Sequence, residues 1–355
     1  MGELTISTPD FSTPQAPSNK ALNNTITKLI FIFFLIIFSL LLYFISSPIV
    51  SPKSTEEGGF IPTPTPTPIS TVTLGLVGDL SLGRYITSTA RNKQDFSWSF
   101  REISPWLLSN DFNLANLESP IIASCPEGKT GTFTFCGDEK FLPYLKSNKF
   151  VLNLANNHIL NYGEDGLSQT HNFLSENNII YFPEFTTKKI NGISFGFLGY
   201  DFITYPVIAP TRLWREQARQ SQIIADIEKY NPEVDWLIVS IHWGNEYLPK
   251  AETWRVNLAR ELVDAGADII HGHHPHVWQD YEIYKDKPIF YSFGNFIFDQ
   301  SWSYETSHSQ IARLILSKTK IKDLELFPIE IKYNSQPALI FGAPASGAPT
   351  KASAQ

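Results

Sequence analysis

The chain has 355 residues, a length that allows one large domain or two ordinary ones, and 43% of the residues are hydrophobic, which is enough for a substantial core. The formal net charge is -7. A protein that binds nucleic acid without sequence preference needs a basic face, so this charge argues against that function class.

The first 46 residues are predicted to lie outside the folded domain. Residues 1–28 are polar and are predicted to form a disordered cytoplasmic tail. Residues 29–46 contain the uncharged run Leu29–Ile45, which reaches the lower end of membrane-spanning length. The run is longer than the apolar core of a cleavable signal peptide, and no small-x-small cleavage site follows it. The segment is therefore predicted to be a transmembrane signal anchor, with a buried core helix as the alternative.

Charge around the apolar run indicates its orientation. Lys20 and Lys28 precede the run and Lys53 follows it, so the positive-inside rule favours a cytoplasmic N-terminus. The chain is then predicted to be a single-pass protein of the cell membrane, with its bulk outside the cytoplasm. Residues 47–70 carry Thr-Pro repeats and are predicted to form an extended spacer. Residues 71–335 are assigned to the globular domain and residues 336–355 to a flexible tail.

The two cysteines, Cys125 and Cys136, bracket the segment PEGKTGTFTF. In an extracytoplasmic domain such a pair can close a loop as a disulfide. The alternative is two unpaired buried thiols, and the predicted topology favours the disulfide.

From residue 71 onward, short apolar runs with β propensity repeatedly end in polar residues. The run 71–77 leads into Gly78-Asp79, the run 111–116 into Leu117-Glu118, and the run 150–155 into Asn156-Asn157-His158. The run 235–241 leads into His242-Trp243-Gly244, the run 267–270 into the histidine stretch 271–276, and the run 287–293 into Gly294-Asn295. Amphipathic helical patterns lie between them at 164–178, 221–230 and 252–266. Strands that alternate with helices predict an α/β fold, in which ligands bind beyond the carboxyl ends of the strands.

Each polar cluster has an ordinary explanation when it is taken alone. Gly78-Asp79 could be a turn, Glu118 a surface carboxylate and His242 a core histidine. Together, however, two carboxylates, one carboxamide and several imidazoles are predicted to meet at one sheet edge. This mixed oxygen and nitrogen donor set suits divalent ions such as Mn, Fe, Zn or Mg, which the pattern does not distinguish.

Residues 271–276 hold four of the eight histidines in the chain. In an extended segment, residues i and i+2 project to the same side, and a proline between them favours an extended backbone. The stretch His274-Pro275-His276 is therefore predicted to be extended, with both imidazoles facing one site. A His-rich polar loop without a metal is the alternative.

These residues carry a resemblance. The order of Asp79, Glu118, Asn157-His158, His242 and His274-x-His276 is similar to the ligand order of calcineurin-like metallophosphoesterases. The segments GDLSLGR, NLESPI, LANNHILNYGEDGL, SIHWGNEY, HGHHPHVWQDYE and YSFGNFIFDQ resemble the CapA-type poly-γ-glutamate capsule-synthesis family over residues 73–300.

The resemblance implies a four-layer α/β/β/α metallophosphoesterase-like sandwich, preceded by one N-terminal transmembrane helix. It implies that one or two divalent metal ions are bound by six ligands, with Glu118 as the bridge: Asp79, Glu118, Asn157, His242, His274 and His276. His158 would be the catalytic acid or an anion contact. Trp243, Glu246 and Asn295 would lie around the substrate.

Two positions depart from the family patterns. Ser81 stands where the phosphoesterase pattern has a histidine, and a hydroxyl is a poorer metal ligand than an imidazole, so one metal site would be weak or empty. Asn161 stands where CapA-type sequences carry an aspartate. An asparagine can accept the N–H of His158, but it does not stabilise an imidazolium.

The leading functional expectation is a CapA-like protein in the synthesis, export or attachment of an anionic capsule or cell-surface polymer, with possible metal-dependent hydrolase or transferase activity. Its partners would be that polymer or a phosphoester, the membrane, and other membrane subunits of capsule synthesis. The alternatives are a polymer-binding module without activity and a surface metallophosphatase that acts on small phosphoesters.

Overall fold

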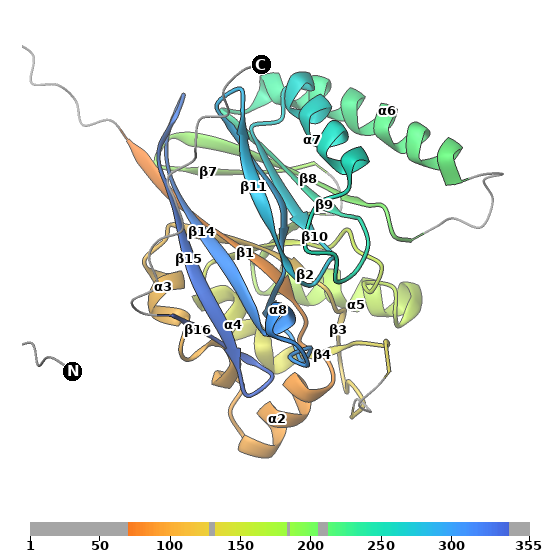
Figure 1. Cartoon of the computed structure of the whole chain (residues 1–355). Helices are drawn as coiled ribbons and strands as arrows, with labels where there is room; N and C mark the ends of the chain where they lie inside the picture. The colour runs from red at the N-terminus through yellow and green to blue at the C-terminus, as the bar shows by residue number, and fades with distance from the viewer. Residues whose placement is uncertain (1–69, 128–131, 183–184, 205–211, 341–355) are drawn as a thin grey trace, which may run out of the picture. The chain divides into compact units, whose positions relative to one another are not determined.

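The computed structural model describes residues 70–127, 132–182, 185–204 and 212–340 (Figure 1). The predicted cytoplasmic tail (1–28), the predicted anchor (29–46) and all but the last residue of the predicted spacer lie outside these ranges. None of the helices in the described ranges is long and apolar enough to cross a membrane.

Eight of the strands form one mixed sheet, sheet 1, with the order β16-β15-β14-β1-β2-β5-β6 and β13 paired to β1. Its strands are β1 (Thr71–Leu80), β2 (Phe112–Leu117), β5 (Phe150–Asn153), β6 (Ile180–Phe182), β13 (Asn295–Ile297), β14 (His308–Ser317), β15 (Ile321–Lys332) and β16 (Gln336–Leu339). β1, β2, β5 and β6 run parallel, so their carboxyl ends meet at one edge. β14, β15 and β16 add an antiparallel part.

Six further strands form sheet 2, with the order β11-β12-β10-β9-β8-β7. They are β7 (Thr186–Ile190), β8 (Ile193–Asp201), β9 (Trp236–His242), β10 (Ile269–His273), β11 (Trp278–Tyr284) and β12 (Lys287–Phe293). The central strands β8, β9, β10 and β12 are parallel. A separate short pair consists of β3 (Ile121–Ile122) and β4 (Gly137–Asp138).

The described helices lie on the two outer faces of the sheets (Figure 1). Those packed against sheet 1 are α2 (Tyr85–Lys93), α3 (Ser104–Leu108), α4 (Leu142–Ser147) and α5 (Gly163–Glu176), and those packed against sheet 2 are α6 (Arg212–Tyr230) and α7 (Thr253–Ala265). A short helix α8 (Tyr304–Ser307) precedes β14, and the 3-10 turns are Trp98–Phe100, Glu139–Phe141 and Asn231–Glu233.

An apolar core between the sheets completes a helix/sheet/sheet/helix order. Phe112 of β2 contacts Phe195 of β8 across this core, with ring centroids 5.1 Å apart. Buried side chains of β1, β14, β9 and β12 extend the same core. The described residues therefore have the α/β/β/α layer order that the resemblance implied.

The predicted strands and helices are present, with shifts at their ends. The helix predicted at 252–266 is α7, which ends at Gly266 with φ +120°, a conformation that glycine adopts without strain. The pattern at 221–230 is only the last part of α6. Strand β16 pairs with β15 over residues 336–339, so the folded domain extends past the predicted boundary at 335. The boundary was placed too early because the strand is four residues long and polar at its start.

Candidate metal centre

Five of the predicted metal ligands meet where their strands end. Asp79 lies in β1, Glu118 follows β2 and His242 ends β9, while His274 and His276 follow β10. All five are buried. His276 Nδ1 lies 3.4 Å from Asp79 Oδ2, and His276 Nε2 lies 3.7 Å from Glu118 Oε1. His274 Nδ1 lies 3.2 Å from His242 Nε2.

Two groups of described residues bring their donor atoms within 4.8 Å of one another, which is close enough to share a metal ion. One group is Asp79, Glu118 and His276, and the other is Glu246, His274 and His276. His276 belongs to both. The exposed Glu246, which sequence analysis placed beside the substrate, is therefore a candidate ligand as well.

Asp79 is held in place because Gly78 lets two strands approach closely. A Cβ atom on Gly78 would lie 2.0 Å from the carbonyl oxygen of Gly294, so a larger residue does not fit. The Asp79 N–H donates to that same carbonyl oxygen over 2.9 Å. Gly78-Asp79 is thus part of strand β1 and not a turn.

Asn116 joins the two carboxylates, and sequence analysis did not select it. Its Nδ2 lies 2.9 Å from Asp79 Oδ1 and 3.2 Å from Glu118 Oε2, and it also approaches His242 Nδ1 at 3.3 Å. Asp79, Asn116 and Asn153 are cross-strand neighbours in β1, β2 and β5. The available signal was one of two asparagines in a strand whose other residues are apolar, the one two positions before Glu118.

Two further asparagines connect this cluster to the loop after β5. Asn153 Nδ2 and Asn156 Nδ2 each donate to Asn116 Oδ1 over 3.1 Å. Asn156 Oδ1 accepts the backbone N–H of His158, also over 3.1 Å. The carboxylates and the loop that carries His158 therefore share one hydrogen-bond network, which fixes their relative positions.

The other two histidines of the 271–276 stretch form a chain of contacts that ends at Asp79. His273 Nδ1 lies 3.0 Å from Asp79 Oδ1, and His273 Nε2 lies 3.0 Å from His271 Nδ1. His271 Nε2 lies 2.9 Å from the carbonyl oxygen of Val77, which can only accept, so this nitrogen carries the proton. His271 and His273 are fully buried and orient a ligand.

The backbone around Pro275 is not extended, and this prediction was wrong. His274 has φ +96° and His276 has φ +58°, so both lie in the left-handed region. Proline fixes only its own φ, and the residues on either side turn sharply. The imidazoles still converge, with ring centroids 5.9 Å apart. Positive φ costs about 1–2 kcal/mol at a non-glycine residue, and such strain is often found at functional sites.

Asn295 sets the tautomer of His276. Its Nδ2 donates to the carbonyl oxygens of Thr306 (3.1 Å) and Gln300 (3.4 Å), so its Oδ1 is the atom 3.0 Å from His276 Nδ1. His276 therefore carries its proton on Nδ1 and directs the Nε2 lone pair at Glu118. Sequence analysis expected Asn295 to lie beside a substrate. The side chain is only 1% exposed, and it instead orients a candidate ligand.

His158 is held in the same way. Asn161 Oδ1 accepts the backbone N–H of Phe135 (2.8 Å) and lies 3.1 Å from His158 Nδ1. His158 therefore donates from Nδ1 and turns Nε2 toward Glu118 Oε1, 3.8 Å away. Burial lowers the pKa of His158 to about 4. Glu164 and Asp165, the carboxylates nearest to Asn161 in sequence, are exposed at the start of α5.

The loop that carries Phe135 is closed by a disulfide between Cys125 and Cys136, whose Cα atoms are 5.8 Å apart. The Phe135 ring packs on His158 with centroids 4.2 Å apart. The disulfide therefore holds one wall of the candidate site.

Trp243 does not lie beside a substrate, which corrects the expectation from the resemblance. It is fully buried, and its indole N–H donates to the carbonyl oxygen of Tyr291 over 3.0 Å. Its ring packs against Trp254 of α7. Successive residues point to opposite sides, so the chain that directs His242 into the site directs Trp243 into the core between sheet 2 and its helices.

Asn157 and Ser81 differ in whether their side-chain oxygen is available to a metal ion. Asn157 Oδ1 is buried and has no hydrogen-bond partner among the described residues. The Ser81 hydroxyl accepts from the N–H of Gly83 over 3.4 Å. Asn157 therefore has an oxygen free for a ligand, while Ser81 contributes to a local turn.

Burial controls the charges of the cluster. Burial by itself would raise the pKa of Asp79, but hydrogen bonds from His273 and His276 hold that pKa well below its usual range. Burial, followed by repulsion from Asp79, raises the pKa of Glu118 well above its usual range. Burial also lowers the pKa of His274 to about 3. Neutral imidazoles and close carboxylates are the forms in which these side chains bind cations.

The donor set fits a divalent metal ion on two further observations. Glu118 Oε1 is buried and has no hydrogen-bond partner among the described residues, and the same holds for Asn157 Oδ1. A buried oxygen without a partner costs roughly 1–3 kcal/mol, more when it is charged. A cation between the carboxylates and imidazoles would satisfy Glu118 Oε1 and offset the repulsion between Asp79 and Glu118.

Comparison with known proteins shows the family of the chain. The sequence model of the family described as "Bacterial capsule synthesis protein PGA_cap" matches residues 73–300. The chain is 31% identical over 292 residues to the capsule biosynthesis protein CapA of Bacillus anthracis, covering 74% of this chain and 68% of the relative. It is 31% identical over 274 residues to the PGA biosynthesis protein CapA of Bacillus subtilis (strain 168), covering 72% of this chain and 70% of that relative.

Among solved structures, a hypothetical protein from Thermus thermophilus superposes with a TM-score of 0.47 at 13% sequence identity. The overlap covers 73% of this chain and 99% of that one. A score of this size carries no argument about function.

Proposed function

Because the chain belongs to the bacterial capsule synthesis family PGA_cap, we propose that it acts in the synthesis, export or attachment of an anionic cell-surface polymer of the poly-γ-glutamate type. In this proposal the protein is held in the cell membrane by residues 29–46 and works outside the cytoplasm. Other membrane subunits of capsule synthesis would be its partners.

The proposal includes a divalent metal centre of the metallophosphoesterase type. The observation that carries it is the unpaired Glu118 Oε1 inside a buried cluster of carboxylates and imidazoles. Asp79, Glu118, His242, His274 and His276 would hold the metal, with Asn157 and Glu246 as further ligands. When bound, a divalent ion supplies Lewis-acid chemistry at a phosphoester or amide bond.

Two histidines, His276 and His158, have defined roles in this proposal. His276 offers the Nε2 lone pair because Asn295 holds its proton on Nδ1. His158 holds or gives a proton at Nε2, since Asn161 occupies its other nitrogen. In its neutral form this nitrogen is an acceptor, so donation to a leaving group requires that His158 first gains a proton.

A second candidate function is a polymer-binding module without catalytic activity. Ser81 favours it, because its hydroxyl is engaged with the N–H of Gly83 and a hydroxyl is a poorer metal ligand than the imidazole of the phosphoesterase pattern. With one metal position weakened, the centre would hold a polymer carboxylate without breaking a bond. A surface metallophosphatase with a small phosphoester substrate is the third possibility that the experiment below distinguishes.

The test is the metal content of the purified full-length chain after Mn, Fe, Zn and Mg have each been offered. The variant is the double substitution His274→Asn and His276→Asn, since asparagine tolerates the positive φ of both positions. His171→Asn is the matched control, because this half-buried histidine stacks on Tyr181, outside both ligand groups.

We expect one or two ions per chain, lost in the double variant and kept in the control. Substoichiometric metal in all three proteins would contradict a metal centre. Turnover is then measured with a chromogenic phosphodiester and with a γ-glutamyl oligomer. Cleavage of the first alone supports the metallophosphatase, cleavage or transfer of the second supports the proposal, and binding of the second without turnover supports the polymer-binding module.

A further inference from the structure

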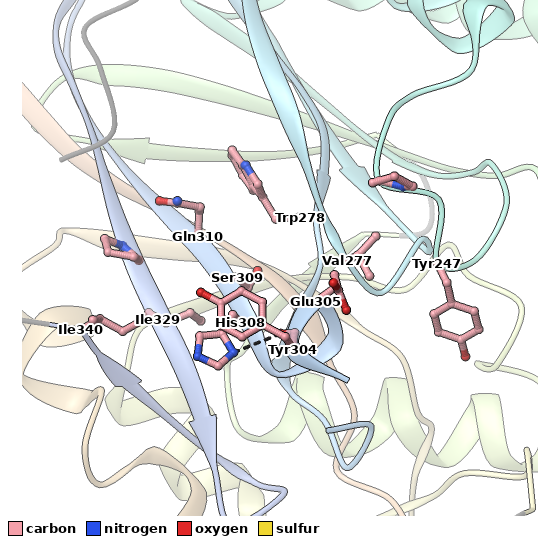
Figure 2. A pocket seen from close by; sticks show the side chains of 12 residues that line it. Tyr247, Val277, Trp278, Tyr304, Glu305, His308, Ser309, Gln310, Ile329 and Ile340 are labelled. Atoms are coloured by element: carbon pink, nitrogen blue, oxygen red, sulfur yellow. Dashed lines mark hydrogen bonds between the residues drawn. The ribbon is translucent and has the colours of Figure 1, made fainter. Parts of the chain in front are cut away.

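A pocket of about 250 Å³ lies outside the metal centre (Figure 2). It is enclosed by β14, β15 and α8, together with the start of β11 and the loop after β9. Figure 2 shows side chains from these elements around one hollow. Pockets for drug-sized ligands measure roughly 300–1,000 Å³, so this pocket suits a unit about the size of one ring.

The walls of this pocket are largely aromatic, and the described residues that line it include no lysine or arginine. Trp278, Tyr304 and Tyr247 supply the ring surfaces. Tyr304 is 70% exposed and stacks on His308, with centroids 3.8 Å apart. The carboxylate among these lining residues is that of Glu305. An anionic occupant would thus meet the Glu305 carboxylate and no permanently charged cation, with His308 as the one imidazole among the described lining residues.

The pocket also contains an acceptor without a partner. Gln310 lies at the wall near Trp278 (Figure 2), and its Oε1 is buried without a hydrogen-bond partner among the described residues. Protein atoms cover this oxygen in the described structure, so the Gln310 side chain would have to rotate before the oxygen could accept a hydrogen bond from a ligand in the pocket. The Glu305 carboxylate at the same pocket is a second acceptor. A hydroxyl or amide N–H of a ligand could donate a hydrogen bond to Gln310 Oε1 or to this carboxylate.

Tyr247 connects the pocket to the metal centre. Its ring lines the pocket and lies 6.3 Å, between centroids, from the ring of His276. Trp302, which is 62% exposed, packs on the edge of Tyr247 at 5.9 Å. Tyr247 therefore belongs both to the pocket lining and to the surroundings of the candidate ligand His276.

We propose that this pocket binds an uncharged sugar ring, as the neighbouring unit of a substrate or acceptor at the metal centre. The apolar face of a sugar packs against aromatic rings, and its hydroxyl groups donate to Gln310 and Glu305. A γ-glutamyl unit fits less well because its carboxylate would be desolvated beside Glu305 without a cation. The inference goes beyond the proposed function, since it concerns residues outside both ligand groups.

The test measures binding of four probes to the full-length chain in a detergent without a sugar headgroup. The probes are maltotriose, tri-N-acetylchitotriose, tetra-γ-glutamate and adenosine monophosphate. Binding is followed by saturation-transfer NMR and by titration calorimetry. The variants are Tyr304→Ala and Gln310→Leu, and the control is Tyr333→Ala, an aromatic residue that is 68% exposed and does not line the pocket.

We expect at least one trisaccharide to bind, with Kd raised tenfold or more in both pocket variants and unchanged in the control. Because Tyr304 is exposed, its replacement is compatible with folding, which the retained binding of metal would verify. Sugar binding should persist in the His274→Asn/His276→Asn variant, so a failure of the metal centre would leave this test intact. Binding of neither trisaccharide, binding unchanged in both pocket variants, or pocket-dependent binding of tetra-γ-glutamate or the nucleotide instead would each overturn the proposal.

Discussion

Replacing Asn116 with leucine is the most direct test of how the candidate centre is assembled. The side chain amide is the shared donor to Asp79 Oδ1 and Glu118 Oε2, and its oxygen accepts from Asn153 and Asn156. Leucine has a similar shape and no polar atom. The substitution therefore removes the network and leaves the packing of β2 largely intact.

The expected loss follows from the bonds that disappear. A hydrogen bond to a charged group contributes about 1.5–3 kcal/mol and a neutral one about 0.5–1.5 kcal/mol. Asp79 Oδ1 keeps its contact with His273, and Asn156 Nδ2 keeps the carbonyl oxygen of Leu117. Allowing for these retained partners, the free energy of unfolding should fall by about 3–5 kcal/mol.

Asn113→Leu is the matched control, because Asn113 is equally buried on the same strand. Its amide donates to the carbonyl oxygens of Leu107 and Asn148, and its oxygen accepts from Asn110. The control should also lose stability, by about 2–4 kcal/mol. It leaves the carboxylates untouched.

The assay is urea unfolding followed by tryptophan fluorescence, without metal and with metal at 100 times the Kd of the native chain. Metal should stabilise the native chain and Asn113→Leu by about 2.7 kcal/mol. A misplaced ligand weakens binding about 10–100-fold, so the gain for Asn116→Leu should fall to about 1.4 kcal/mol or less. The reasoning is refuted if Asn116→Leu costs under about 1 kcal/mol, below a single charged bond, or if metal stabilises both variants equally.

Three further outcomes follow from the contacts described above. Asn295→Ala removes the acceptor that holds His276 Nδ1, so metal affinity measured by chelator competition should fall about 10–100-fold, and an unchanged affinity would mean that Asn295 does not orient the ligand. Reducing the bond between Cys125 and Cys136 should lower the free energy of unfolding by about 2–4 kcal/mol, while a double alanine variant should show the lower value with or without reductant. Trp243→Phe should cost about 1–3 kcal/mol of stability, because the buried Tyr291 carbonyl keeps only its longer hydrogen bond from Arg255 and the smaller ring packs less well, and it should leave the affinity for a γ-glutamyl oligomer unchanged. Weaker binding at unchanged stability would return this residue to the substrate site.

The pattern of apolar runs that end in polar residues was sufficient to predict the edge of the sheets where the candidate centre lies. Within sheet 1, the carboxyl ends of parallel strands meet at one edge, so local sequence already brings Asp79 and Glu118 together. His242 ends a strand of sheet 2, so its approach to them, which was expected at the edge of a single sheet, depends on how the two sheets pack. The helix patterns followed from periodicity, and the ligand order followed from the family resemblance. Residues 1–69, which carry the predicted anchor and spacer, lie outside the described part of the chain.

Side-chain direction depended on tertiary structure. Sequence analysis expected His274 and His276 to converge through an extended backbone, and they converge through two left-handed residues instead. The backbone there donates from His274 to Asp79 and accepts at Pro275 from the N–H of Tyr247, and both partners are far away in sequence. Trp243 was placed with the substrate because it follows a ligand, yet it belongs to the core.

By itself, then, the sequence determined the α/β architecture through its periodicity, and the family and the candidate ligand order through its motifs. Only the tertiary structure decided which atom of each residue faces the centre, that Asn116 links the carboxylates, and that an aromatic pocket adjoins them. These features arise from contacts between residues that are distant in the chain. No local pattern of hydrophobic and polar residues encodes them.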